Sequence, residues 1–268
     1  MRRFNPQLGP QGELRHFLTT EGLSRVQLEG LLDSAARMAG AQVPASLQGR
    51  TIGLSGLDAT LEGIVARAVR RLGGGLWVGA DPLARPADAH VLAHKASGAA
   101  HGLARGQPHV INAGDGWHAR PLPALADLLH IRQAKGGFTE LRIALLGDLR
   151  HDGRGRCLVH ALTTLGAPQL RLATARALRP DGLAQLGLSA HDDTAQALEQ
   201  ADVVIDLGLQ PDALAVLPSA RDYARRWGLT PAARACAQPD ALFLGDTPAA
   251  GVETAAMAVL HTLLGARP

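Results

Sequence analysis

The most informative part of this chain is Val110–His118, whose sequence is VINAGDGWH. It begins as a short apolar run, which predicts a buried strand, and continues into a glycine-containing turn with an acidic side chain. A run of the same kind, RIALLGD, occupies Arg142–Asp148, and a helical pattern that ends with His160–Gly166 follows it. Strands that end in such loops are typical of parallel α/β sheets, which bind ligands at the carboxyl ends of their strands.

Strand patterns and helical patterns alternate along the whole chain. We expect strands near 51–54, 76–78, 88–92, 109–112, 141–147, 169–173, 202–206 and 241–244. We expect helices near 24–39, 58–72, 121–134, 154–165, 194–200, 218–227 and 252–264. This alternation predicts an α/β fold with two doubly wound parallel-sheet domains.

Local signals define two of these helices more closely. Ser24 and Gln27 have the spacing of a capping box at the start of the first helix. Pro121 suits the first turn of the long helix 121–134, which links the two domains. Its expected buried stripe consists of Leu125, Leu128, Leu129 and Ile131.

The composition limits the class of protein. With 268 residues, 46% of them hydrophobic, the chain can bury two medium-sized cores. Cys157 and Cys236 cannot form a disulfide framework and lack the paired spacing of a zinc site, so we expect two buried thiols. His90 and His94 flank a strand pattern instead of sharing a helix face. We therefore expect no metal site and no cofactor.

Charge and hydropathy argue against two further classes. The net charge is +3, the only lysines are Lys95 and Lys135, the arginines are scattered, and aromatic residues make up 3% of the chain. Nucleic-acid binding needs clustered cations and stacking platforms, so it is not expected. No apolar run reaches the length of about 18 residues that a membrane span needs. We expect no signal peptide and a cytoplasmic protein.

The loop from Gly147 to Gly155 has the outline of a dinucleotide-binding fingerprint. However, Leu158 stands where the third glycine is needed, and the following strand does not end in an acidic residue. The motifs Gly147–His151 and His160–Leu162 instead resemble those of aspartate carbamoyltransferases in identity and spacing. Val110–His118 shares this resemblance, as do the segments Gly12–His16, Glu21–Leu23, Trp227–Thr230 and Gly251–Glu253.

The resemblance to the aspartate/ornithine carbamoyltransferase family implies a domain organisation and a kind of site. It implies a carbamoyl-phosphate-type domain at 1–135, an aspartate-type domain at 136–250, and a C-terminal helix, 252–264, that returns to the first domain. It also implies trimeric assembly. The site would hold a carbamoyl phosphate dianion beside an aspartate dianion, which requires several cations and a helix N-terminus.

The phosphate-binding run of that family, Ser-Thr-Arg-Thr-Arg, falls on the segment Asp58, Ala59, Thr60, Leu61 and Glu62. Both arginines are missing, and two carboxylates stand in the segment. Loss of one preorganised donor costs about two to three orders of magnitude in rate, and carboxylates repel a dianion. We therefore expect no carbamoylation of aspartate, and we expect Asp58 to cap the helix that follows.

Other positions on the carbamoyl phosphate side have also changed. The family arginine that follows the strand near 88–92 falls on Ala93, and the His-Pro-Thr-Gln run falls on Arg120–Pro123, where only the proline remains. A loop that carries a serine and a lysine into a neighbouring subunit in the family is deleted between Val78 and Asp88. His118 keeps a polar side chain near the position of the carbamoyl group.

The aspartate side has lost its cations as well. Two family arginines fall on Gly153 and Gly208, although Arg154 lies one place away and is a candidate partial substitute. The family's His-Pro-Gly-Pro loop falls on Leu244–Thr247, and none of its residues is retained there. Gln210 matches a substrate contact but cannot hold a carboxylate alone.

Two hypotheses follow from this pattern. The leading one is a pseudoenzyme, a non-catalytic homologue that acts as a homotrimer or in a hetero-oligomer with an active transcarbamoylase or a dihydroorotase of pyrimidine biosynthesis. The alternative is a divergent carbamoyltransferase or small-molecule binder in which Arg120, Arg154 and His118 form a rebuilt anion pocket. Basic groups around an open cleft would favour the alternative, whereas an acidic or filled cleft would favour the pseudoenzyme.

Overall fold

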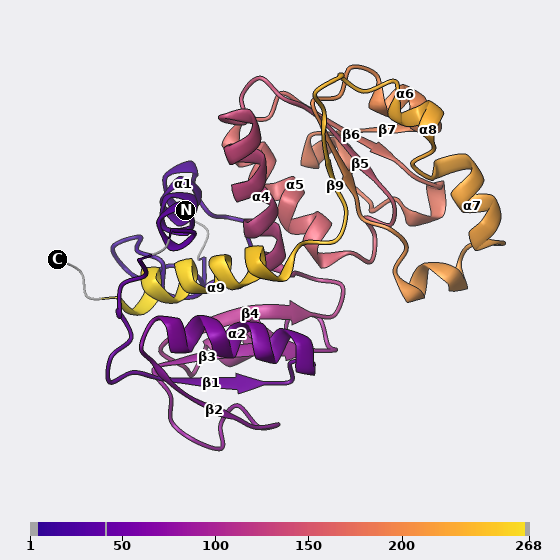
Figure 1. Ribbon diagram of the computed structural model, residues 1–268. Coiled ribbons are helices and arrows are strands. Elements are labelled where there is room, and N and C mark those ends of the chain that lie inside the picture. The colour runs from indigo at the N-terminus through magenta and orange to yellow at the C-terminus, as the bar shows by residue number, and fades with distance from the viewer. Residues whose placement is uncertain (1–4, 41, 266–268) are drawn as a thin grey trace. The chain divides into compact units, whose positions relative to one another are not determined.

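The computed structural model describes residues 5–40 and 42–265. Its contacts divide the chain into two compact units, Met1–Leu129 with Pro248–Pro268 and His130–Thr247. Each unit contains one parallel sheet (Figure 1), so the predicted α/β class with two parallel-sheet domains is confirmed. The division falls inside helix α4 (Pro121–Lys135), a few residues before the expected boundary. Because α4 is continuous, no linker in the sequence marks this point.

The sheet of the first unit has four strands in the order β2-β1-β3-β4. The strands are β1 (Thr51–Ser55), β2 (Gly75–Val78), β3 (Ala89–His94) and β4 (Val110–Asp115). All neighbouring strands are parallel, and the register shifts between Leu92 and Ala93 in the β3–β4 pair. The carboxyl ends of β3 and β4 therefore bring Ala93 and Asp115 to the same edge of the sheet.

The helices of the first unit are α1 (Arg25–Met38), α2 (Ala59–Arg71), α3 (Ala99–Ala104) and α9 (Ala249–Leu264). Helix α9 contacts both α1 and α2 (Figure 1). The Ser34 hydroxyl donates a hydrogen bond to the Ala258 carbonyl at 3.3 Å, and the Glu253 carboxylate pairs with Arg67 and Arg71 at 3.0 and 3.1 Å. The last helix thus belongs to the first unit, although the two segments are far apart in the sequence.

The capping box at Ser24 is confirmed, because the Ser24 hydroxyl accepts from the Gln27 amide at 3.3 Å while the Gln27 side chain accepts from the Ser24 amide at 2.8 Å. The residues of α4 that were expected to be buried, Leu125, Leu128, Leu129 and Ile131, are all buried, but burial is not confined to one stripe, because every residue over 121–129 is buried. At Ala126 the small side chain lets the backbone of α9 approach closely. A Cβ atom at Gly251 would lie 3.3 Å from the Ala126 Cβ.

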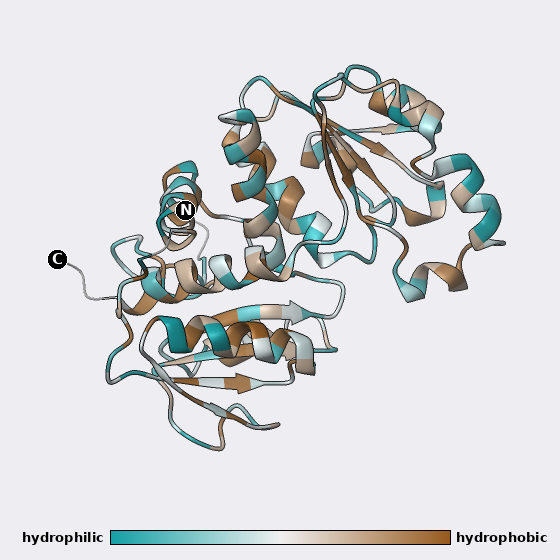
Figure 2. Cartoon of the chain, in the orientation of Figure 1, coloured by the Kyte–Doolittle hydropathy of each residue, from teal (hydrophilic) through white to brown (hydrophobic). Residues whose placement is uncertain are grey.

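The second unit has a five-stranded sheet in the order β7-β6-β5-β8-β9. Its strands are β5 (Arg142–Leu146), β6 (Gln169–Ala173), β7 (Leu188–His191), β8 (Val203–Asp206) and β9 (Leu242–Leu244). Its α-helices are α5 (Gly153–Leu165), α6 (Thr194–Leu198), α7 (Ala220–Trp227) and α8 (Pro231–Arg234). The central strands β5 and β8 are mostly hydrophobic (Figure 2) and buried, as the middle of a sheet covered on both faces requires.

One strand and two α-helices were not expected from the sequence, namely β7, α3 and α8. The short 3-10 helices η1 (Arg176–Leu178), η2 (Leu183–Leu186) and η3 (Pro211–Ala215) were not expected either. Strand β7 lies at the edge of its sheet, and its exposed Ser189 and Ala190 break the apolar pattern. Helices α3 and α8 are too short to show helical periodicity. Cys157 is buried as expected, but Cys236 is only partly buried and lies just after α8. Within the described residues, no helix combines the length and apolarity that crossing a membrane requires.

Candidate functional site

The N-terminus of α2 is closed by the protein itself. Asp58 has the extended backbone of an N-cap residue, and its carboxylate accepts a hydrogen bond from the Leu61 amide at 2.9 Å. Glu62 adds a second carboxylate in the first turn. The expected cap is confirmed, and negative charge at a helix N-terminus is stabilised by the helix dipole. An anion that approached this helix would meet an occupied amide and two like charges.

The neighbouring positions of the first unit offer few groups that bind anions. Ala93, the last residue but one of β3, has only a methyl side chain, and a Cβ atom at Gly56 would lie 2.0 Å from the Ala93 carbonyl oxygen, so the backbone is tightly packed there. Gly56 has a φ of +73°, which a glycine tolerates. Arg120 is exposed, and the aliphatic part of its side chain lies against Gly114. Arg120 is therefore the one cation among these substituted positions of the first unit.

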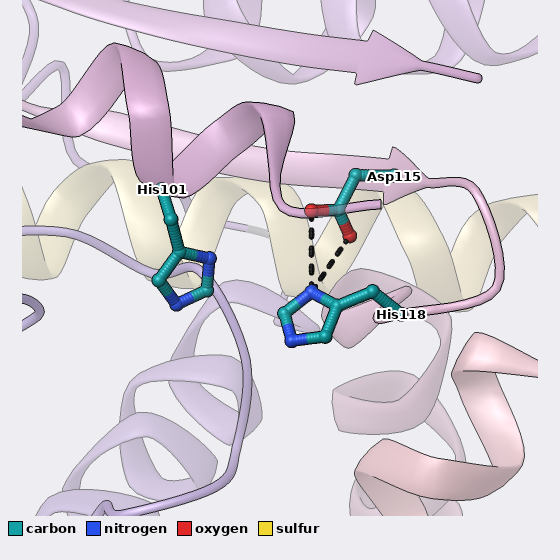
Figure 3. Close-up of side chains that lie close together, drawn as sticks. All are labelled: His101, Asp115 and His118. Atoms are coloured by element: carbon teal, nitrogen blue, oxygen red, sulfur yellow. Dashed lines mark hydrogen bonds and ion pairs between the residues drawn. The ribbon is translucent and has the colours of Figure 1, made fainter. Parts of the chain in front are cut away.

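The loop after β4 brings together His118, Asp115 and His101 (Figure 3). The His118 Nδ1 atom lies 3.1 and 3.2 Å from the two carboxylate oxygens of Asp115. The Asp115 side chain is fully buried, whereas that of His118 is 31% exposed. Burial opposes ionisation of the carboxyl, but hydrogen bonds from His118 and Asn112 outweigh it and lower the pKa of Asp115.

His101 comes from α3 and meets His118 edge-on, with ring centroids 5.1 Å apart. Burial and the nearby His118 lower the pKa of His101, which favours its neutral form. Sequence reasoning missed His101, because α3 has no recognisable pattern and the contact joins residues on different elements. The sequence points to His118, either near the position of the carbamoyl group or as part of a rebuilt anion pocket, but not to a pairing with His101.

In the second unit, the loop after β5 holds a buried carboxylate–histidine pair. Asp148 is fully buried and accepts hydrogen bonds from the amide and the Nδ1 atom of His151, at 3.1 and 2.9 Å. The Asp148 amide donates to the Gly208 carbonyl at 2.9 Å. A Cβ atom at Gly147 would lie 2.4 Å from that carbonyl oxygen, so only glycine fits there. These contacts tie the loop to the end of β8.

Asp152 caps α5, since one of its carboxylate oxygens accepts from the amides of Arg154 and Gly155 at 2.7 and 2.9 Å. The other oxygen accepts from Nε2 of Gln210 at 3.1 Å. Gly153 is the first residue of the helix and is buried. A second helix N-terminus is therefore occupied by an aspartate of the chain, and the Gln210 amide is engaged with it.

The Arg154 guanidinium is directed to the protein backbone. It donates to the carbonyls of Gly245 and Asp206 at 2.8 and 3.1 Å, and to the Thr247 hydroxyl at 3.1 Å. Arg154 is 7% exposed. These bonds hold the segment after β9, where Leu244 is buried at the end of the strand, against the start of α5. The expectation that Arg154 replaces a lost substrate arginine is not supported by these contacts, because its donors serve the fold.

Two cavities lie in the described part of the first unit, and no predicted substrate position lines either of them. One, of about 810 Å³, includes Arg50, Asp88 and His109 in its wall. The other, of about 710 Å³, includes His16 and His101. Burial, followed by the charges of Arg15 and nearby histidines, lowers the pKa of His16 to about 4, so His16 is neutral at physiological pH.

No protein-family model matches the sequence. Solved structures, in contrast, match over nearly the whole chain. An ornithine carbamoyltransferase from Thermus thermophilus has a TM-score of 0.80 and 21% sequence identity, with 93% of this chain and 99% of that chain covered. An aspartate transcarbamoylase from Trypanosoma cruzi, in complex with carbamoyl phosphate and aspartate, has a TM-score of 0.80 and 20% identity, with 94% and 96% covered.

An ornithine carbamoyltransferase from Gloeobacter violaceus is similar to the same extent, with a TM-score of 0.79, 20% identity, and coverage of 94% of this chain and 99% of that one. The chain therefore has the carbamoyltransferase fold. At such identities the likeness concerns the fold alone, since one fold supports different functions and the site must be argued from its own residues.

Proposed function

We propose that this protein is a non-catalytic homologue of the carbamoyltransferases that acts through assembly with other protein chains. The observation that carries the proposal is the hydrogen bond between the Asp58 carboxylate and the Leu61 amide. Resemblance places the phosphate grip of the active enzymes at this helix start. Here a side chain of the protein occupies it, with Glu62 beside it.

The contacts of Arg154 support the same proposal. A substrate-binding arginine needs donors directed to the ligand, whereas this guanidinium donates to Gly245, Asp206 and Thr247. With both family arginines of the phosphate grip absent and Arg154 engaged, too few cations are available to hold two dianions. Losses of groups that act together are not additive, so the residual rate is expected to approach that of the uncatalysed reaction.

The catalytic half of the proposal is tested by assays on the purified protein. We expect no saturable carbamoyl transfer to aspartate or ornithine, and no saturable heat on titration with carbamoyl phosphate or a bisubstrate analogue, with an active transcarbamoylase as the positive control. Saturable turnover that disappears in Arg154→Ala or His118→Ala would refute the proposal and support a rebuilt anion pocket.

The assembly half concerns the partner, for which the resemblance suggests a homotrimer or a complex with an active transcarbamoylase or dihydroorotase of pyrimidine biosynthesis. Light scattering of the protein alone, and of mixtures with each purified enzyme from the same cells, gives the mass of any complex. We expect either a trimer or a defined mixed complex. A monomer at micromolar concentration that changes the mass and activity of neither enzyme would contradict assembly.

A further inference from the structure

The ring nitrogens of His101 and His118 and the carboxylate of Asp115 form a compact group in the first unit (Figure 3). One possible ligand atom from each residue lies within 4.8 Å of the other two. Imidazole nitrogen and carboxylate oxygen are ligands that Zn²⁺ accepts, and zinc sites with three protein ligands keep a fourth position for water or another small ligand. The group shares no residue with the capped start of α2 or with the hydrogen bonds of Arg154.

Hydrogen bonds hold the Asp115 carboxylate in one orientation. Its Oδ1 atom accepts from Nδ2 of Asn112 at 2.8 Å and from the Ala119 amide at 3.1 Å, and its Oδ2 atom accepts from the Gly98 amide at 2.9 Å. These donors hold a fully buried carboxylate in one position without using His118. Hydrogen bonds of this kind around a ligand are what fixes the geometry of a metal site.

His101 supplies a second reason to assign a ligand to this place. Its Nδ1 atom is buried and has no hydrogen-bond partner among residues 5–40 and 42–265. A buried polar atom without a partner costs free energy, commonly about 1–3 kcal/mol. A metal ion coordinated by Asp115 and the two imidazoles would lie close to the rings of His101 and His118, which already contact each other.

We propose that His101, Asp115 and His118 bind a divalent transition-metal ion, with Zn²⁺ the best match to the ligand set. Metal–nitrogen distances of about 2.0–2.1 Å in a tetrahedral site place ligand atoms roughly 3.3 Å apart, so the three side chains need only a small closing rotation. Coordination through Nδ1 of His118 requires its proton to reside on Nε2, and the ion then replaces the present bond to Asp115. The Asn112, Ala119 and Gly98 donors remain on the carboxylate.

The sequence alone predicted no metal, because the two histidines are not spaced as a motif and come from different elements. The proposal does not depend on the absence of carbamoyl transfer. A zinc ion here would stabilise the loop between β4 and α4, on which His118 lies.

Metal analysis of the dialysed protein tests the assignment. After equilibration with Zn²⁺ and removal of excess, we expect a single zinc ion per chain. His101→Ala and His118→Ala should each lose the bound zinc, whereas His130→Ala, which removes an exposed histidine outside the group, should retain it. Circular dichroism of each variant shows whether its fold is intact.

Cobalt provides a second measurement on the unaltered protein, which does not depend on how the variants fold. Co²⁺ in a site with two imidazoles and a carboxylate should give the visible absorption of a tetrahedral complex, and added Zn²⁺ should remove it. The proposal is wrong if the unaltered protein retains no zinc and gives no such spectrum. It is equally wrong if both histidine variants bind zinc as well as His130→Ala does.

Discussion

The Asp58 carboxylate and the Leu61 amide, 2.9 Å apart, close the helix start at which active carbamoyltransferases are expected to hold phosphate. An acidic cap is stabilising there without any ligand, because it satisfies a backbone donor and complements the helix dipole.

Asp58→Ala is expected to lower the free energy of unfolding by about 0.5–2 kcal/mol, because the Leu61 amide loses its acceptor. Asp58→Asn is the matched control, since asparagine caps about as well but carries no charge. Urea denaturation followed by circular dichroism measures both. An alanine variant as stable as the parent would show that Asp58 is not a stabilising cap.

Arg154→Met is expected to destabilise the protein by about 1–3 kcal/mol, since it removes the charged donor that bonds the partly buried carbonyls of Gly245 and Asp206. Arg221→Met on the exposed face of α7 should change the stability by less than about 0.5 kcal/mol. Chemical denaturation measures the free energy of unfolding of both variants. If Arg154→Met left stability unchanged, the guanidinium would be available for a ligand after all.

Acid is expected to destabilise the fold through its buried histidines. Burial lowers the pKa of His90, and burial together with nearby positive charge lowers the pKa of His16 to about 4. The unfolded chain protonates these groups near their ordinary pKa of about 6.5. Below that pH the unfolded state binds more protons, so the stability that is present above it is lost as the pH falls.

The measurement is the free energy of unfolding against pH. His90→Leu should flatten the decline below about pH 6.5 by removing one of the contributing groups, and His130→Leu should leave its shape unchanged. A decline of identical slope in His90→Leu would show that His90 contributes nothing to it.

The attachment of α9 is expected to depend on apolar packing more than on its ion pairs. Met257 is fully buried, so Met257→Ala should cost about 2–5 kcal/mol. Glu253→Gln breaks the pairs with Arg67 and Arg71, whose side chains are 53% and 43% exposed, and should cost less than about 1 kcal/mol. Thermal unfolding of the two variants compares their losses of stability. A larger loss for Glu253→Gln than for Met257→Ala would contradict this account.

Much of the fold could be predicted from local sequence. Apolar runs at the positions of β1, β3, β5 and β8 imply buried strands, because a strand covered on both faces must be apolar throughout. Ser24 and Asp58 cap their helices through bonds to residues three places away, so their roles can be read from spacing.

Long-range contacts could not be predicted in this way. The edge strand β7 and the short helix α3 owe their conformation to neighbours, since too few of their residues are buried to produce a pattern. Arg154 is one residue from Gly153, where the sequence resemblance predicts a substrate arginine, yet its direction is set by carbonyls that lie 52 and 91 places further along the chain. His101 and His118 become partners only because α3 packs beside β4. Sequence spacing reports bonds within a turn of helix, whereas the direction of a buried cation and the meeting of two histidines depend on how distant segments pack.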